Sequence, residues 1–312
     1  MFKKLFLSLL AILSLSQPIG LSQEAPPFNQ IERDPLDNMP ILEKNKFGVG
    51  NPPPIARRGL EYRKFLSASV KIAVGESSGS GTIVHYDPQK NLAYVATCGH
   101  LWPEGIMTVE QGKKLNRKCR IIVWYQNDQK LDAPKYYNAN VIFYSFLTGQ
   151  DTGLVTFTPD WVPNTFPIGP KNYEYIKGQY AHSCGCDSGS EVAHYDVEFI
   201  MLQKFMIEGT NTETLDLVTE KNSPRPGRSG GGLMNDEGFY IGTCWGTQYR
   251  DGTGKGYFTP LSVIHRFWSK QNGYAFLLEQ KSSSGAAQLL KIIDHSNSGL
   301  KFAAEYIILP VK

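Results

Sequence analysis

Short apolar runs recur along the chain from about residue 66 onward, and each run is closed by Gly, Asn, Asp or Pro. β-branched and aromatic residues dominate these runs, which is typical of strands. The runs that predict strands are 69–74, 81–84, 92–97, 120–125, 153–157, 197–202 and 239–243. Many short strands separated by turn residues predict an all-β sandwich or barrel.

Helical spacing is found near the end of this region. Apolar residues at positions 261, 264, 267 and 268 predict a helix over 261–270. Beyond it, 286–293 has the pattern of a short helix and 303–311 that of a strand.

The first residues have the pattern of an export signal. Lys3 and Lys4 precede a largely apolar run from Leu5 to about Leu15, and small residues before Gln23 suit a signal peptidase. The run is shorter than the roughly 20 apolar residues of a membrane span. We therefore expect a cleaved signal peptide over 1–22, a secreted or periplasmic protein, and no stable membrane anchor.

The remaining chain divides by composition into three parts. Residues 23–64 are rich in proline and charge, which predicts an N-terminal arm or a propeptide. The strand-rich region spans 65–272 and is long enough for one large domain. Residues 273–312 form a C-terminal extension that is short for a further domain.

Composition narrows the class of partner. The chain has 312 residues, 41% of them hydrophobic, and a net charge of +3 with a pI of about 8.4. This supports a globular core and gives no reason to expect a nucleic-acid partner. The five cysteines are odd in number, so at least one stays unpaired, and bridges from Cys98 to Cys119 or to Cys244 remain open.

One glycine-rich segment carries a candidate nucleophile. In the run Arg225-Pro-Gly-Arg-Ser-Gly-Gly-Gly-Leu, Ser229 is flanked by glycines and precedes an apolar stretch. Gly227 would let the chain turn so that its N–H and that of Ser229 point at one spot, which is the arrangement of an oxyanion hole. An ordinary glycine-rich turn is the alternative.

Two further titratable residues lie at the ends of predicted apolar strands. His100 follows the strand 92–97 and the small residues Cys98 and Gly99. Asp151 stands just before the apolar strand 153–157, where a buried carboxylate needs a partner such as a histidine N–H. A core histidine and a loop aspartate are the alternatives for each residue taken alone.

Together, the order His100, Asp151, Ser229 resembles that of the chymotrypsin/trypsin-like serine proteases. Segments 79–84, 242–246 and 256–260 and the helix at 261–270 resemble other parts of that family, so the resemblance spans about 66–272. The protein is most similar to bacterial members such as the HtrA protease domains, without a PDZ domain.

The resemblance implies two packed six-stranded antiparallel Greek-key barrels with a C-terminal helix. It also implies a serine endopeptidase with Ser229 as nucleophile, His100 as base, Asp151 as orienting carboxylate, and Gly227 and Ser229 as oxyanion donors. No metal or other cofactor is implied, and the expected partner is a protein or peptide substrate. The substrate-binding residues that it implies are Ser223, Cys244, Trp245, Gly246 and Gly256.

Several positions depart from the family's pattern. Arg228 stands where trypsin-type zymogens have the aspartate that pairs with a new N-terminus, so activation by N-terminal insertion is not expected. Cys244 replaces a serine that supports the aspartate in many relatives. Ser223, at the expected floor of the specificity pocket, is not acidic, which argues against a preference for Lys or Arg and favours an apolar side chain.

Three other functions compete with this interpretation. The chain could be a catalytically inactive binding module on the same fold, or an esterase that uses the same three residues. A metal site is a further alternative, in the segment that holds His182, Cys184 and Cys186 together with His194, although the spacing matches no standard site.

Overall fold

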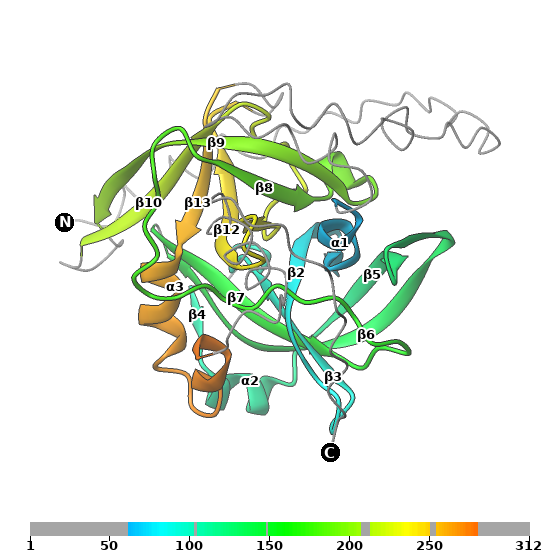
Figure 1. Cartoon of the computed structure of the whole chain (residues 1–312). Coiled ribbons are helices and arrows are strands. Elements are labelled where there is room, and N and C mark those ends of the chain that lie inside the picture. Colours follow the sequence, from blue (N-terminus) through cyan, green and yellow to red (C-terminus); the bar gives the residue numbers. More distant parts are fainter. Residues whose placement is uncertain (1–61, 103–104, 148, 207–212, 250–253, 280–312) are drawn as a thin grey trace, which may run out of the picture. The chain divides into compact units, whose positions relative to one another are not determined.

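The computed structural model describes residues 62–102, 105–147, 149–206, 213–249 and 254–279. These residues form mainly antiparallel strands, which close into two barrels (Figure 1). Helices are few and short. Among the described residues, no helix has both the length and the apolar character needed to span a membrane.

The first barrel contains six strands in the order β6-β5-β1-β2-β3-β7, and pairing between β7 and β6 closes it. A short strand β4 is added beside β6 outside the ring. The strands are β1 (Ser69–Val74), β2 (Ser77–Asp87), β3 (Leu92–Thr97), β4 (Ile106–Met107), β5 (Lys118–Gln126), β6 (Gln129–Leu147) and β7 (Gln150–Phe157).

The second barrel also contains six strands, in the closed order β10-β13-β12-β11-β8-β9. All of its pairings are antiparallel. The strands are β8 (Tyr180–Gly185), β9 (Ala193–Met206), β10 (Glu213–Glu220), β11 (Gly232–Met234), β12 (Tyr240–Thr247) and β13 (Gly256–Pro260).

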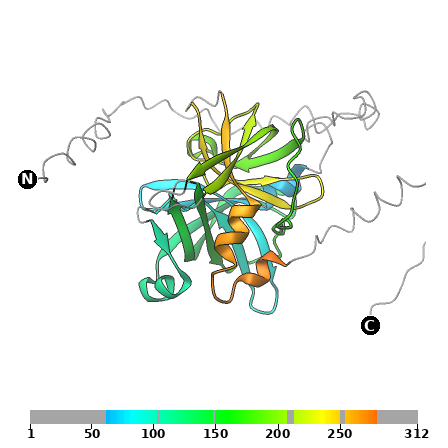
Figure 2. The ribbon, with the colours of Figure 1, turned by 90° about the vertical axis from the view of Figure 1, so that its left-hand side faces the viewer.

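Within the described part of the chain, the barrels are accompanied by the helices α1 (Tyr62–Ser67), α2 (Val109–Leu115) and α3 (Leu261–Trp268) and by the 3₁₀ turns η4 (Asp187–Gly189) and η5 (Ala275–Leu278). Helix α3, drawn in orange, contacts β7 of the first barrel and β10, β12 and β13 of the second (Figures 1 and 2). Its Trp268 is fully buried and donates from Nε1 to Thr152 Oγ1 at 3.1 Å. One helix therefore packs against both barrels.

Each barrel encloses apolar side chains that alternate along its strands. The first encloses Val70, Ile72, Ile83, Val95, Ile121 and Val155. The second encloses Ala181, Val197, Leu217, Leu233, Ile241 and Phe258. Burial of this apolar surface is the main stabilising contribution to both barrels. All five cysteines lie within the described residues, and each is a buried free thiol.

The predicted fold class is confirmed, since the described residues form two closed six-stranded antiparallel barrels followed by a helix. Six of the seven predicted strands lie within observed strands, and the seventh, 239–243, begins one residue before β12. The helix expected over 261–270 is α3. Residues 1–61 and 280–312 lie outside the described residues, and with them the expected signal peptide, most of the arm, and the elements expected at 286–293 and 303–311. The segment after 272 packs on the domain, since Leu277 is buried and Tyr274 contacts Phe143.

Candidate active site

His100 and Asp151 are joined by their side chains. His100 Nδ1 lies 2.5 Å from Asp151 Oδ2. The other carboxylate oxygen, Oδ1, accepts hydrogen bonds from Gly99 N at 2.5 Å and from His100 N at 3.0 Å. Asp151 is 4% exposed, so this buried carboxylate has three N–H partners that compensate for its lost hydration.

The strand register explains why these two segments meet. Strands β3 and β7 are antiparallel, and Thr97 is opposite Gly153. Continuing this register by two residues on each strand brings Gly99 opposite Asp151. The pairing of β3 with β7 therefore delivers the carboxylate to the backbone that carries His100.

The His100 ring is partly open to solvent, with 25% of its side chain exposed. Burial lowers the pKa of His100, but the neighbouring Cys98 sulfur and the hydrogen bond to Asp151 raise it, and the net change is upward from the ordinary value of 6.5. The Asp151 carboxylate thus favours the protonated ring, the state that a general base reaches after it accepts a proton.

Ser229 lies on a turn of the second barrel that packs against the first. Its carbonyl accepts a hydrogen bond from Ser80 N of β2 at 2.6 Å. The next residue, Gly230, has φ +86°, and a Cβ there would come within 2.3 Å of Thr97 Oγ1 and 3.0 Å of Cys98 N. Only glycine fits this contact, which seats the serine turn on the end of the strand that leads to His100.

The Ser229 hydroxyl itself makes no hydrogen bond to His100 among the described residues. The recorded contact of His100 Nε2 is instead with Cys98 Sγ, at 3.7 Å. Burial raises the pKa of the Cys98 thiol, and the residue is fully buried, so it is a neutral thiol and a poor nucleophile. The structure therefore joins His100 to Asp151 by a hydrogen bond and brings the backbone of Ser229 to the same place.

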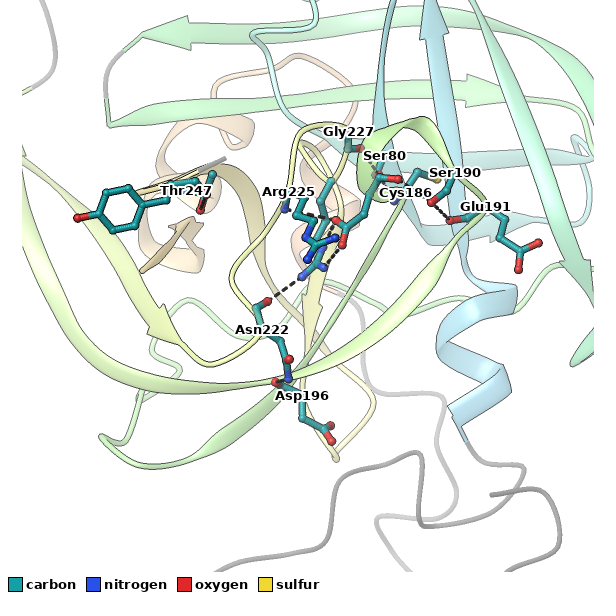
Figure 3. Close-up of polar contacts among 12 residues, drawn as sticks. Ser80, Cys186, Ser190, Glu191, Asp196, Asn222, Arg225, Gly227 and Thr247 are labelled. Atoms are coloured by element: carbon teal, nitrogen blue, oxygen red, sulfur yellow. Dashed lines mark hydrogen bonds and ion pairs between the residues drawn. The ribbon is translucent and has the colours of Figure 1, made fainter. Parts of the chain in front are cut away.

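The turn before Ser229 contains a glycine in the left-handed region of backbone conformation. Gly227 has φ +96°, in the region that favours glycine. Its carbonyl accepts from Ser80 Oγ at 2.7 Å, and Ser80 Oγ in turn accepts from Cys186 N at 2.8 Å (Figure 3). The contact with Ser80 thus fixes the Gly227 carbonyl. The N–H groups of Gly227 and Ser229 donate hydrogen bonds to no described residue.

Arg228 is buried, with 1% of its side chain exposed, and pairs with Asp187. Its Nε donates to Asp187 Oδ1 at 2.8 Å and its Nη2 to Oδ2 at 2.5 Å, a two-point contact that fits the planar guanidinium. Nη1 donates to the Asn222 carbonyl at 3.0 Å (Figure 3). The guanidinium also lies 3.7 Å from the ring centre of Tyr195. This pair anchors the residue between Gly227 and Ser229.

The residues expected to bind substrate divide into open and packed positions. Gly246 has open space around it, and Trp245 is half-buried. By contrast, a Cβ on Gly256 would lie 2.6 Å from Pro224 Cδ, so this glycine serves close packing and not an open pocket. Ser223 is buried, and its hydroxyl donates to the Gly254 carbonyl.

Cys244 is also buried, and its carbonyl accepts from Gly230 N at 2.7 Å. It therefore contributes a backbone contact that holds the serine turn. Burial raises the pKa of its thiol, which keeps the sulfur neutral.

Sequence reasoning missed Asp187 and Asp216. Asp187 follows Cys186 as an ordinary loop aspartate, and only its contact with buried Arg228 reveals its role. Asp216 is 1% exposed and accepts from Trp245 Nε1 at 3.2 Å, while its Oδ2 has no hydrogen-bond partner among the described residues. Burial raises the pKa of Asp216 to about 7. The only sequence feature that pointed to a buried Asp216 is its position in a stretch of alternating polar and apolar residues.

Two groups of side chains among the described residues could hold a metal ion. One is Cys98, His100 and Asp151, and the other is His182, His194 and Asp196. The latter shares its two histidines with the metal alternative of the sequence, but Asp196 takes the place of the thiols. Cys184 packs in the core of the second barrel, and Cys186 packs against Leu66 and Val192.

We predict that Asp187→Ala lowers the free energy of unfolding by about 3–5 kcal/mol, because it leaves the Arg228 guanidinium buried without its carboxylate. The measurement is urea denaturation followed by circular dichroism.

A matched control is Glu191→Ala in the same loop region. Glu191 pairs with Lys130 at 2.9 Å, but both side chains are about half exposed. Its removal should change the free energy of unfolding by no more than about 1 kcal/mol. Equal losses for the two variants would contradict the role given to the Arg228–Asp187 pair.

Comparisons with known proteins return similar structures only. No protein-family model matches the chain. No curated protein sequence matches it. The inactive form of the Rv3671c protease of M. tuberculosis is 15% identical, with a TM-score of 0.49, over 68% of this chain and 92% of that chain.

Two other solved structures are similar to a comparable degree. The MamO protease domain of Magnetospirillum magneticum is 17% identical, with a TM-score of 0.45, over 66% of this chain and 98% of that one. Deg5 is 16% identical, with a TM-score of 0.48, over 66% and 89% of the two chains. The strand pairing of the chain itself, two closed six-stranded antiparallel barrels followed by a helix, is that of the chymotrypsin-like fold.

Proposed function

We propose that this protein is a serine endopeptidase in which Ser229 attacks the peptide bond, His100 is the general base and Asp151 orients it. The observation that carries the proposal is the Asp151 carboxylate, which holds both the backbone and the Nδ1 of His100. The serine turn packs on the end of the same strand, through Gly230 against Thr97 and Cys98.

In the first step, His100 Nε2 takes the proton of Ser229 Oγ while Oγ forms a bond to the substrate carbonyl carbon. The π electrons of that carbonyl move to its oxygen, which becomes an oxyanion. The N–H groups of Gly227 and Ser229 are available to donate to it, and such donors are worth about 3–4 kcal/mol each. Asp151 stabilises the imidazolium that results.

In the second step, the tetrahedral intermediate collapses. The carbon–nitrogen bond breaks, its electron pair stays on nitrogen, and Nε2 returns the proton to the leaving amine. The acyl group remains on Ser229 Oγ. Water then attacks this ester with His100 again as base, and the acid product and free serine are released.

The mechanism requires Ser229 Oγ to reach His100 Nε2, where Cys98 Sγ is now the neighbour at 3.7 Å. This observation favours a second candidate, an inactive protease-fold module that binds peptides without cleaving them. Apo sites often have long or misaligned catalytic contacts that tighten with substrate, so the contact does not outweigh the held His100–Asp151 pair.

We expect a peptide substrate to bind beside β12 near Gly246. Gly246 has no atom within 4 Å of a would-be Cβ, and Trp245 beside it offers a half-buried aromatic face. We expect an apolar side chain next to the cleaved bond, because Ser223 is neutral and its hydroxyl is already used by Gly254. An ester would follow the same steps, so rates on matched ester and amide substrates separate the two activities.

We also propose that the protein is exported from the cell interior. Lys3, Lys4 and the apolar run that follows favour a cleaved signal peptide and a secreted or periplasmic enzyme. The weak net charge of +3 gives no basis for a nucleic-acid partner.

A fluorophosphonate probe tests the proposal directly, because it reacts much faster with an activated serine hydroxyl than with an ordinary one. We expect one adduct on the peptide that contains Ser229, and none in Ser229→Ala with the same circular dichroism spectrum. A folded wild-type protein that stays unlabelled would favour the inactive binding module, and an adduct on another residue would refute the assignment of the nucleophile.

The rate of labelling should increase with pH. Only neutral His100 can accept the serine proton. Burial lowers the pKa of His100, but the contacts with Cys98 Sγ and Asp151 raise it above 6.5, so the ring is still mostly protonated at pH 6.5. The second-order rate constant of labelling should therefore fall as pH decreases and continue to rise above pH 6.5.

The control for this profile is Asp216→Asn, since burial raises the pKa of Asp216 to about 7, within the same pH range. If the titration of His100 causes the fall in labelling rate at low pH, Asp216→Asn should show the same fall over the same pH range. A fall with its midpoint at or below pH 6.5, or one that disappears in Asp216→Asn, would contradict the assignment to His100.

A further inference from the structure

A second cluster of titratable side chains lies on the β8–β9 hairpin, formed by residues other than those of the proposed active site. His182 is opposite Asp196, and Cys184 is opposite His194 in the antiparallel register. Residues opposite one another share a face of a hairpin, and residues two apart on one strand share it too. The register therefore places His182, His194 and Asp196 on one face.

On this face, one atom from each of the three residues converges on a common point. His182 Nδ1 lies 3.1 Å from Asp196 Oδ1 and 3.2 Å from His194 Nε2. His194 Nε2 lies 3.8 Å from Asp196 Oδ1. Two imidazole nitrogens and one carboxylate oxygen thus form a small triangle of potential ligand atoms.

The size of the triangle fits a tetrahedral zinc ion. Zinc binds imidazole nitrogen and carboxylate oxygen at about 2.0–2.2 Å, and the tetrahedral angle then puts ligand atoms about 3.3–3.5 Å apart. The three observed separations, 3.1, 3.2 and 3.8 Å, bracket that range. Three protein ligands leave one tetrahedral position for a solvent molecule or another ligand.

A fourth residue holds the His182 ring from its other side. His182 Nε2 lies 2.9 Å from Asp236 Oδ1, in the turn after β11. A carboxylate at that nitrogen keeps the ring proton on Nε2 and leaves the Nδ1 lone pair directed at the triangle. This carboxylate–histidine arrangement is the usual support of a zinc-bound histidine.

The surroundings of the cluster are apolar and closed. The side chains of His182, His194 and Asp196 are 2%, 5% and 10% exposed. The ring of Phe65, from α1, lies 4.5 Å from the His182 ring and 5.8 Å from the His194 ring, and stacks on Phe166. A site shielded from water strengthens the interaction of an ion with its ligands.

We propose that His182 Nδ1, His194 Nε2 and Asp196 Oδ1 form a zinc site with three protein ligands, with Asp236 positioning His182. Two neutral imidazoles and one carboxylate leave a zinc ion with a charge of +1, which Asp236 balances. The site joins the β8–β9 hairpin to the turn after β11, and α1 packs over it. It depends on none of the residues proposed for catalysis.

A proton is the competitor for this position. Burial lowers the pKa of His182, but its hydrogen bonds to Asp196 and Asp236 raise it, and the net direction is upward. An imidazolium at His182 could therefore occupy the same triangle with its Nδ1–H shared between Asp196 and His194. Zinc binding would displace that proton.

The test is a titration of the metal-free full-length chain with Zn²⁺ against a chromophoric chelator. We expect one tightly bound zinc per chain in the wild type and a raised melting temperature on zinc addition. Asp196→Asn and His194→Gln should abolish both effects. Asp236→Asn, at a side chain that is 48% exposed, should weaken binding by about 10–100-fold while the protein stays folded.

Two controls locate the ion. His85→Gln removes an imidazole that packs against Tyr94 outside the cluster, and it should leave zinc affinity unchanged. His100→Ala removes a residue of the other candidate group and should also retain the zinc. Loss of the zinc in His100→Ala alone would place the ion at the wrong cluster and overturn the proposal.

Cobalt substitution of the wild type gives a readout that does not depend on any variant folding. A tetrahedral site with nitrogen and oxygen ligands should give an intense visible absorption band for bound Co²⁺. Two results would show that the triangle holds a proton and not a metal. One is a wild-type affinity for zinc no higher than that of Asp236→Asn, and the other is the weak visible spectrum of octahedral Co²⁺.

Discussion

The arrangement at the junction of the barrels depends on one buried carboxylate. Asp151 accepts from Gly99 N, His100 N and His100 Nδ1, so a single side chain fixes both the position and the tautomer of the imidazole. Its backbone carbonyl also accepts from Thr259 Oγ1 of the second barrel at 2.8 Å. Asp151 therefore holds the His100 ring and also links the barrel that carries His100 to the barrel that carries Ser229.

A second buried carboxylate supports the other half of the site. Asp187 holds Arg228 through two hydrogen bonds, and Arg228 is the residue between Gly227 and Ser229. A charge pair built from within the chain can set this turn without a newly cut N-terminus. The cost of burying two ions is offset here by the two-point geometry, the Asn222 carbonyl and the Tyr195 ring, which leave the guanidinium well partnered.

The sequence predicted those parts of the structure that local pattern determines. Strands such as 69–74 and 92–97 were predicted with their observed bounds, because β-branched residues and turn residues mark them clearly. Strand β6 was missed because much of it is exposed and polar, including Pro134, so it has no apolar alternation until it enters the barrel. The order His100, Asp151, Ser229 was readable, and the strand register then explains the contact between the first two.

Other features could not be predicted because they depend on contacts between distant segments. Nothing in the local sequence indicates that Arg228 pairs with Asp187, because the two residues are 41 positions apart. Likewise, nothing in the sequence shows that His182 clusters with other side chains than the two cysteines that follow it. Gly256 was expected to bind substrate, but a Cβ there would lie 2.6 Å from Pro224 Cδ, so the structure packs this glycine against Pro224. The contact of Cys98 with His100 Nε2 likewise follows from side-chain packing at the strand end and not from spacing.

The central claim is that the Asp151 carboxylate makes His100 competent to activate Ser229. Asp151→Asn tests it most directly, because the amide keeps the shape of the side chain while it favours the wrong imidazole tautomer. The measurement is the second-order rate constant of fluorophosphonate labelling, with circular dichroism to establish an unchanged fold. The account predicts a loss of about 10⁴-fold, as found for the equivalent change in other triads. A folded Asp151→Asn protein that labels at a rate close to that of the wild type would contradict it.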